Sequence, residues 1–212
     1  MPNRRPKNNL PDLSFEEQAH REGYTLIAGL DEVGRGSLAG PVVSSAVIFP
    51  RGVRVPEVND SKKLSASKRE FLFLAITAAA TDIGVGLADS EEVDRLNILN
   101  ATRLSMERAI AAMTVSPDFL LIDAVTLKRI ALPQRAIVKG DTLSHAIAAA
   151  SIIAKVTRDR MMADYHDLFP QYNLLSNKGY GTVEHRSCIR RFGPTRIHRQ
   201  SFLKKIFQQD VE

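Results

Sequence analysis

Residues 27–41 read IAGLDEVGRGSLAGP, and the rest of the chain is interpreted outward from this stretch. The apolar run 25–30 predicts a short buried strand that ends in two acids, Asp31 and Glu32. Neighbouring side chains of a strand point to opposite faces, so the two carboxylates can share one site only if the backbone leaves the strand there. The glycines that follow permit such a turn.

The loop after the acids carries Gly34, Arg35 and Gly36 in a row. Glycines let a backbone approach a ligand closely, and an arginine between them is placed to meet a phosphate. For an Asp-Glu pair alone, an ordinary strand-to-turn junction with solvated acids is the commoner arrangement. The attached Gly-Arg-Gly favours a binding site.

Two further acids follow predicted strands. Asp123 closes the apolar run 118–123, and Asp141 follows the predicted strand 134–138 and precedes a helix. A hard divalent cation needs several oxygen ligands, so these acids are candidate partners for the first pair. Asp141 has an equally simple alternative role as a helix N-cap or turn residue.

The composition is that of an ordinary globular protein, with 44% hydrophobic and 25% charged residues among 212. Lys and Arg outnumber Asp and Glu by 29 to 24, a net charge of +5 that fits a nucleic-acid partner without requiring one. The single cysteine, Cys188, excludes an internal disulfide and a thiolate zinc site. No run of 18 apolar residues and no signal-peptide pattern is present, so we expect a cytoplasmic protein with no membrane partner.

The periodicity predicts strands alternating with helices. A capping box of Ser14 and Glu17 predicts a helix over 14–21. Strands are predicted at 25–30, 41–50, 82–87, 118–123 and 134–138, and helices at 66–80, from about 90 to 113, and at 144–165. The first two strands are expected to form a hairpin-like antiparallel pair, and the fourth to be central. This order indicates an α/β fold with a mixed sheet.

Basic and polar side chains form two candidate phosphate-binding segments. The loop 51–65 holds Asn59, Ser61 and Lys62, which could bind a phosphate or could simply lead into a helix. On the helix 144–165, Lys155 and Arg158 share a narrow stripe with two serines. That stripe could be a solvated face, but we favour a position near the site, or one supporting its acids.

The segment 177–182 reads NKGYGT and contains Tyr180 between two glycines. An aromatic ring beside a lysine suits stacking on a base or sugar, although a surface turn explains the pattern equally well. The five histidines lack the spacing of a zinc site, and we expect them to be structural or phosphate-facing.

Taken together, these blocks resemble ribonuclease HII, the prokaryotic type 2 ribonuclease H. Its first motif is usually D-E-[AV]-G-R-G-P-L-A-G-P, from which Ser37 departs, and Arg35 separates it from the Gly-Thr-Gly of ribonuclease HIII. Further matches are the N-D-S-K-x-L block from residue 59, the G-D before I-A-A-A-S, K-G-Y-G-T-xx-H, and the closing H-R-x-S-F. The matched blocks run in the family's order from about residue 27 to 202.

The resemblance implies a ribonuclease H-like mixed five-stranded sheet flanked by helices. It implies a catalytic core at 14–165 and a small helical, substrate-binding C-terminal portion at 166–212, while the polar, basic residues 1–13 themselves predict a flexible tail. Matched residue by residue, it makes Asp31, Glu32, Asp123 and Asp141 catalytic ligands of two divalent ions, Mn²⁺ or Mg²⁺. It implies substrate contacts from a further set of residues: Gly34, Arg35, Gly36, Asn59, Ser61, Lys62, Lys155, Arg158 and Tyr180.

The activity so implied is hydrolysis of RNA in RNA–DNA hybrids and cutting 5′ of ribonucleotides embedded in duplex DNA. The products would carry 5′-phosphate and 3′-hydroxyl ends, which suits ribonucleotide excision and primer removal, and a monomer is expected. One alternative is another nuclease of the ribonuclease H-like superfamily, such as a junction resolvase, which would not need a 2′-hydroxyl. The other is a non-catalytic nucleic-acid-binding protein, which the presence of all four acids disfavours.

Overall fold

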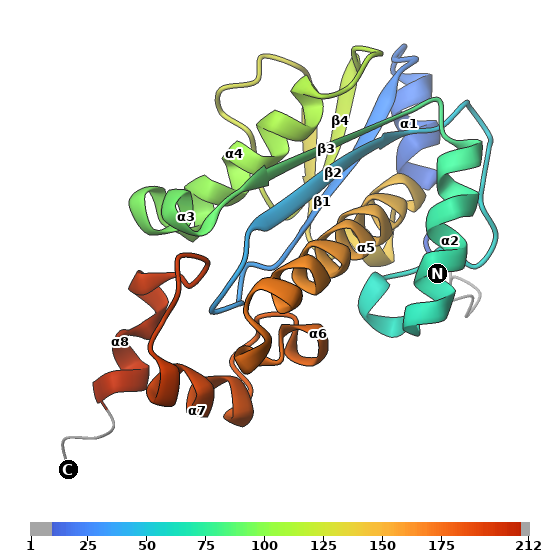
Figure 1. Cartoon of the computed structure of the whole chain (residues 1–212). Helices are drawn as coiled ribbons and strands as arrows, with labels where there is room; N and C mark the ends of the chain where they lie inside the picture. Colours follow the sequence, from blue (N-terminus) through green and yellow to red (C-terminus); the bar gives the residue numbers. More distant parts are fainter. Residues whose placement is uncertain (1–9, 209–212) are drawn as a thin grey trace, which may run out of the picture.

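A five-stranded mixed sheet forms the centre of the computed structural model, which describes residues 10–208 (Figure 1). The strands are β1 Ile27–Val33, β2 Val42–Ile48, β3 Asp82–Ala88, β4 Phe119–Asp123 and β5 Gln134–Ile137, in the order β3-β2-β1-β4-β5. β1 pairs antiparallel with β2 and parallel with β4. The predicted fold class and the hairpin-like first pair are therefore confirmed; β4 is an interior strand, but β1 holds the middle position.

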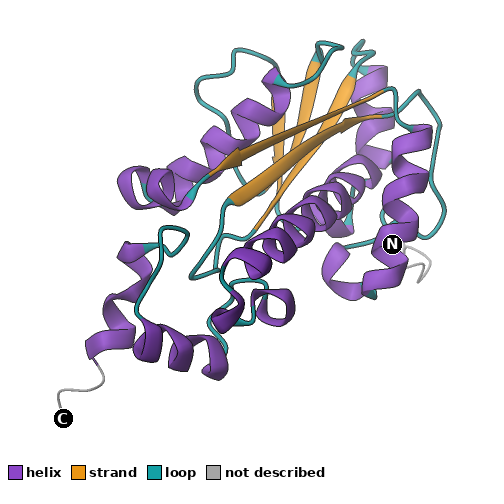
Figure 2. Cartoon of the chain, in the orientation of Figure 1, coloured by secondary structure: helices purple, strands orange, loops and turns teal. Residues whose placement is uncertain are grey.

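Helices cover both faces of the sheet (Figure 2). They are α1 Ser14–Arg21, α2 Ala66–Ala79, α3 Ser90–Leu96, α4 Ile98–Ala111, α5 His145–Leu168, α6 Leu174–Asn177, α7 Val183–Phe192 and α8 Gln200–Gln208, with short 3-10 turns η1 Ser61–Lys63, η2 Gly140–Thr142 and η3 Pro170–Tyr172. One apolar cluster joins α5 and α2 to the sheet, and a second joins α4 to its other face. Within residues 10–208, no helix combines the length and the apolar character needed to cross a membrane.

Glycines in the strands allow the two main helices to lie directly on the sheet. A Cβ at Gly29 would stand 2.3 Å from the carbonyl carbon of Ala146 at the start of α5. On the other face, a Cβ at Gly84 would stand 2.0 Å from the carbonyl oxygen of Ala109 in α4. Both distances are far below van der Waals contact, so each position needs a residue without a side chain.

The C-terminal helices α6, α7 and α8 gather beyond the end of β1, below the sheet in Figure 1. Their own apolar cluster includes Tyr172, Ile189 and Leu203, together with Met162 from α5. The predicted boundary between residues 165 and 166 therefore falls inside α5, which continues to Leu168 and belongs to both parts.

Two N-terminal predictions need correction. Residues 1–9 of the predicted tail lie outside the described residues, but Asp12 already pairs with Ser144, so the tail does not extend to residue 13. The capping box at Ser14 is wrong, because Leu13 is the N-cap and makes no side-chain cap hydrogen bond. Glu17 instead pairs with Arg51 at 2.9 Å.

Candidate active site

β1 runs straight through the acidic pair. Asp31 lies opposite Ser45 and Glu32 opposite Ser44 in the β1–β2 register. The Ser45 hydroxyl donates to the Ala150 carbonyl of α5, whereas the Ser44 hydroxyl bonds that of Ser105 in α4. Cross-strand partners share a face, so Asp31 leaves β1 on the side of α5 and Glu32 on the side of α4. The two carboxylates nevertheless remain near enough for the charge of Glu32 to raise the pKa of Asp31. Our expectations that the strand ends at residue 30 and that the backbone then turns are wrong.

Parallel pairing brings Asp123 beside Asp31. Leu30 pairs with Ile122 of β4, and each acid is the next residue along its strand. The Gly140 amide then donates to the Asp123 carboxylate at 2.7 Å, which draws η2 and its Asp141 to the same end of the sheet. Asp31 near the end of β1, Asp123 at the end of β4 and Asp141 in the turn after β5 thus lie at the same end of the sheet.

Asp31 is the electrostatic centre of this group. Its side chain is buried, with 4% of the residue exposed. Burial, then the charges of Glu32 and Asp123, raise the pKa of Asp31 well above its usual value, against a 2.8 Å hydrogen bond from the Glu32 amide. Asp141 adds to the same increase. A carboxylate in this setting is stabilised by any cation that enters.

A cation would also stabilise the neighbouring carboxylates of Glu32 and Asp123. Burial raises the pKa of Glu32, opposed by the Arg35 guanidinium, whose Nη1 is 3.2 Å from Glu32 Oε1. Burial also raises the pKa of Asp123, opposed by the Gly140 amide. The second carboxylate oxygen of Glu32, Oε2, is buried and has no hydrogen-bond partner.

The donor set fits a hard divalent cation, because all four side chains offer carboxylate oxygens. Within residues 10–208, no three acidic, histidine or cysteine side chains are already close enough to hold a metal ion. Glu32 pairs with Arg35 in this structure, and Asp141 Oδ2 is 3.3 Å from Lys62 Nζ. The unpartnered Glu32 Oε2 and the mutually repelling charges around Asp31 are the features that a bound cation would satisfy.

The glycine loop after β1 is shaped by Arg158 of α5. Gly34 has a φ of +91°, and a Cβ there would stand 2.3 Å from Arg158 Nε. Arg158 is fully buried and donates to the carbonyls of Pro41, Lys178 and Ala39 at 2.9 to 3.0 Å. The guanidinium therefore supports the glycine loop from inside, whereas the sequence had left open a place near the site or a support of its acids, and it is fully buried.

Arg199 performs the same function from the other side, and sequence reasoning gave it no role. It is fully buried and donates to the carbonyl oxygens of Gly40 at 2.8 and 3.1 Å and of Arg35 at 2.9 Å. Burial, with the nearby charge of Arg158, lowers the pKa of Arg199 to about 9. The closing H-R-x-S-F block held this residue, but a buried arginine is rare enough that the sequence favours an exposed role.

The other predicted contacts surround the acids to different degrees. Lys62 is exposed and reaches Asp141, while the Ser61 amide donates to Ser151 of α5 at 3.3 Å. Asn59, half-buried, accepts from the Asp60 amide within the same loop. Lys155 forms an ion pair with Asp159 of its own helix at 2.6 Å, and Arg69 of α2 also reaches that carboxylate. Lys155 therefore contacts this ion pair and not the four acids.

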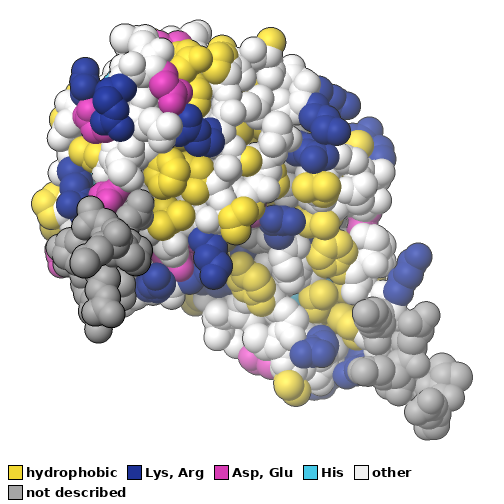
Figure 3. All heavy atoms as spheres, turned by 180° about the vertical axis from the view of Figure 1, so that it is seen from behind, with side chains coloured by type: hydrophobic (Ala, Val, Ile, Leu, Met, Phe, Trp, Pro, Cys, Tyr) yellow, Lys and Arg dark blue, Asp and Glu magenta, His cyan; other side chains and the backbone are white. Residues whose placement is uncertain are grey.

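Tyr180 lies at the other side of the glycine loop, where its residue bridges to Ser37. Its ring is partly exposed and has the Arg158 guanidinium 5.6 Å from its centroid. Gly36 is exposed, and a Cβ there would meet no atom within 4 Å. The loop and the ring thus present an accessible surface beside the acids. On the face seen in Figure 3, Lys and Arg side chains are spread over the surface without forming one block.

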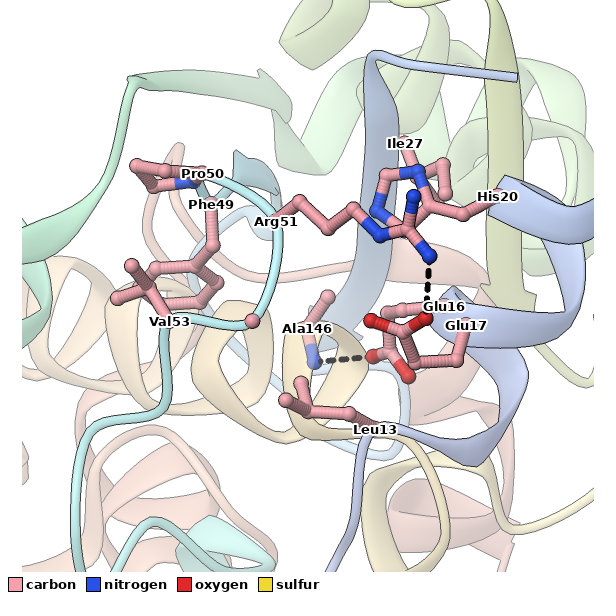
Figure 4. Close-up of a pocket in the computed structure, with 11 residues that line it drawn as sticks. Leu13, Glu16, Glu17, His20, Ile27, Phe49, Pro50, Arg51, Val53 and Ala146 are labelled. Atoms are coloured by element: carbon pink, nitrogen blue, oxygen red, sulfur yellow. Dashed lines mark hydrogen bonds and ion pairs between the residues drawn. The ribbon is translucent and has the colours of Figure 1, made fainter. Parts of the chain in front are cut away.

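A small cavity of about 20 Å³ lies at the opposite end of β1, lined by Ile27, Ala146 and Glu16 (Figure 4). Glu16 Oε1 accepts from the Ser144 hydroxyl and the Ala146 amide at 2.7 and 2.8 Å. The carboxylate therefore caps the start of α5 from a distant part of the chain. Sequence reasoning missed this cap, because it depends on tertiary packing.

Comparison with known proteins agrees with the fold. The family model described as Ribonuclease HII matches residues 28–207. The chain is 56% identical over 191 residues to the ribonuclease HII of Syntrophus aciditrophicus, covering 90% of each chain. Its fold is similar to the ribonuclease H2 of Pyrococcus horikoshii OT3, with a TM-score of 0.69, 26% identity, and 87% of this chain and 98% of that one covered. It is also similar in fold to Bst-RNase HIII, solved in complex with Mn²⁺, with a TM-score of 0.66, 22% identity, and 91% and 72% covered.

Proposed function

This chain belongs to the ribonuclease HII family, and from that premise we propose that Asp31, Glu32, Asp123 and Asp141 are the catalytic acids of its ribonuclease H activity. The activity is endoribonucleolytic cleavage of RNA in RNA–DNA hybrids. One observation carries the assignment of the acids: Asp31 is buried at a sheet edge among three other carboxylates that raise its pKa. Burying like charges together is costly unless cations bind there.

We further propose that two divalent ions, Mg²⁺ or Mn²⁺, bind these oxygens. Such ions supply an activated water as nucleophile and stabilise the charge on the leaving oxygen. Asp31 would hold these ions together with the other three acids, whose charges raise its pKa. Arg35 and Lys62, now paired with Glu32 and Asp141, would be displaced toward the scissile phosphate.

The loop Gly34–Gly36 is proposed to recognise the 2′-hydroxyl through its backbone, since that group distinguishes RNA from DNA. The exposed edge at Gly36 leaves room for close approach, and the partly exposed Tyr180 ring would stack at the junction between ribonucleotide and deoxyribonucleotide. Cutting would then fall 5′ of a ribonucleotide embedded in duplex DNA and leave 5′-phosphate and 3′-hydroxyl ends. These products suit ribonucleotide excision and primer removal.

The test uses a DNA duplex with a single ribonucleotide, an all-DNA duplex of the same sequence, and Mg²⁺ or Mn²⁺. Wild type is compared with Asp31→Asn and with Glu91→Gln, an acid-to-amide change at an exposed position on α3. We expect wild type and Glu91→Gln to cut only at the ribonucleotide. Asp31→Asn, and wild type with chelator, should be at least about 10³-fold slower.

Each other outcome has a definite meaning. Equal cutting of both duplexes would contradict 2′-hydroxyl recognition by residues 34–36 and favour a junction-type nuclease. Binding without cutting by wild type would favour a nucleic-acid-binding protein. Full activity of Asp31→Asn would contradict the acid assignment.

We also propose that the chain works as a monomer in the cytoplasm. The four acids and the two segments proposed to bind substrate all come from one chain. Light scattering with and without a hybrid duplex tests the monomer: a mass near 23.5 kDa for the free protein is expected, and twice that mass would contradict it.

A further inference from the structure

Two buried histidines meet between α7 and the segment that leads into α8. His185 Nε2 and His198 Nε2 are 3.2 Å apart, and both residues are almost fully buried. The Tyr172 ring packs against both imidazoles, with centroids 6.2 and 4.8 Å away. The catalytic proposal above assigns neither histidine a role.

The neighbouring backbone fixes where each proton lies. The Thr195 amide can only donate, and it lies 3.0 Å from His198 Nδ1, so that nitrogen must be an unprotonated acceptor. A neutral His198 then carries its proton on Nε2 and donates it to His185 Nε2. His185 in turn must carry its proton on Nδ1, which lies 3.0 Å from the Tyr180 carbonyl.

Both rings are held in the neutral form that this arrangement requires. Burial, together with the neighbouring His185, lowers the pKa of His198 to about 4. Burial also lowers the pKa of His185, against the Tyr180 carbonyl and the charge of Glu184. The hydrogen bonds therefore form a directed chain from Thr195 through the two histidines to Tyr180.

This chain of hydrogen bonds connects the two segments proposed to hold the ribonucleotide. At one end, the backbone of His198 bridges to Ala39, and the Gly40 amide donates to the Ile197 carbonyl at 2.8 Å. At the other end, the Tyr180 carbonyl accepts hydrogen bonds from His185 Nδ1 and, at 2.8 Å, from the Thr182 amide. The glycine loop and Tyr180 are thereby held in one rigid unit.

We propose that His185 and His198 are positioning residues that fix the Tyr180 backbone relative to the glycine loop and so determine affinity for the ribonucleotide junction. This inference rests on the proposed function of Tyr180. Apolar side chains of similar size would fill the same space without the cost of burying polar rings, so the polar chain has a purpose beyond packing. That purpose is to hold the Tyr180 carbonyl at one place beneath a partly exposed ring.

Two substitutions of His185 separate its two hydrogen bonds. His185→Asn places an amide where Nδ1 was and keeps a donor for the Tyr180 carbonyl, but it loses His198. His185→Gln places its amide where Nε2 was, so it keeps His198 and loses Tyr180. We expect His185→Gln to raise KM for the single-ribonucleotide duplex about tenfold with kcat little changed, because the bond to Tyr180 is lost. His185→Asn keeps that bond but loses the link to His198, so we expect a smaller rise in KM, about threefold.

A double-mutant cycle shows whether His185 acts through Tyr180. In a Tyr180→Ala background the ring to be positioned is gone, so His185→Gln should raise KM no further. Additive effects of the two changes would contradict the proposal. So would equal KM values for His185→Asn and His185→Gln, which is the result expected if the histidine only fills space.

The tautomers can be read in the wild-type protein, without any variant that must fold. Long-range ¹H–¹⁵N spectra of the histidine rings at pH 7.5 should show His185 protonated on Nδ1 and His198 on Nε2. The opposite assignment would overturn the inference. Failure of the proposed function is seen separately, as wild type that does not cut the ribonucleotide duplex.

Discussion

Asp31 and Asp123 lie side by side on adjacent parallel strands, each one residue beyond a matched pair in the middle of the sheet. This arrangement places two carboxylates at one edge before any ligand is bound. Burial and the neighbouring acids raise the pKa of Asp31, so the folded protein holds this proton more tightly than the unfolded chain. The same arrangement that would bind a cation therefore reduces the stability of the metal-free protein.

Asp31→Asn should be more stable than wild type without metal at pH 7.5, by about 1 to 3 kcal/mol, because the amide has no charge to bury. The sign follows from the raised pKa: wild type loses stability as the pH rises from the unfolded pKa of Asp through the folded one. Urea unfolding with EDTA measures the difference. Added Mg²⁺ should stabilise wild type and leave Asp31→Asn nearly unchanged, and equal Mg²⁺ stabilisation of both would contradict the ligand assignment.

Arg35 forms an ion pair with Glu32 in this structure and should compete with a divalent cation for the Glu32 carboxylate. Arg35→Gln is expected to bind Mg²⁺ about two- to fivefold more tightly while cutting the ribonucleotide duplex more slowly, because the proposed phosphate contact would be lost. Isothermal titration calorimetry measures the affinity, with Arg95→Gln as the control at an exposed position on α3. Weaker Mg²⁺ binding by Arg35→Gln would mean that Arg35 supports the metal site instead.

Substitutions of Gly34 and Gly36 should distinguish a structural role of the loop from a role in substrate recognition. Gly34→Ala needs a left-handed φ and collides with Arg158, so we expect a loss of more than about 2 kcal/mol of stability. Gly36→Ala meets open space and should change stability by no more than about 1 kcal/mol. Its cleavage rate should nevertheless fall if the backbone there approaches the 2′-hydroxyl, so full activity of a folded Gly36→Ala would count against that contact.

Arg158→Lys should cost about 3 kcal/mol, because one ammonium cannot reach the three backbone carbonyls that the guanidinium satisfies. Arg160→Lys on the same helix is the matched control, since that side chain is half-exposed, with an ion pair to Glu70 and the Phe73 ring centroid 4.6 Å from its guanidinium. It should change stability by less than about 1 kcal/mol. Thermal or urea unfolding of the two variants decides between a buried support and a surface residue.

Acid should weaken the fold through its buried histidines. Burial lowers the pKa of His145 to about 4, from an ordinary 6.5 in the unfolded chain. Its contribution is fully present above pH 6.5 and is lost as the pH falls toward 4, by about 2 kcal/mol at pH 5. His145→Gln keeps an acceptor for the Val55 amide and does not titrate, so its stability should depend less on pH than that of wild type between pH 7 and 5. Parallel pH dependences would contradict the assignment.

The sequence was sufficient for the sheet, because strands depend on local patterns, whereas the set of four candidate acids followed from the family resemblance and stays a prediction. Apolar runs predicted the strands, and Asp123 could be recognised as the acid that closes one of them. The course of β1 through Asp31 and Glu32 could not be predicted, since the ladder to β2 outweighs the freedom that Gly34 offers.

The role of Arg158 was left open for a related reason. A stripe on an isolated helix cannot show whether it meets solvent or the carbonyls of a loop more than a hundred residues away. The histidine chain was beyond prediction in the same way, because the proton positions on His185 and His198 depend on the Thr195 amide. In each case the partner is a backbone group or lies far away in the sequence, and local sequence patterns do not indicate such contacts.

Arg199 has a consequence for how this protein is made. Its guanidinium holds the carbonyls of Arg35 and Gly40, yet it is synthesised more than 150 residues later. Domains fold progressively as the chain leaves the ribosome, so a nascent chain can contain all four acids while its glycine loop still lacks this support. The glycine loop should therefore gain this support only after residue 199 has been synthesised, and a chain that stops before Arg199 would contain the acids without it.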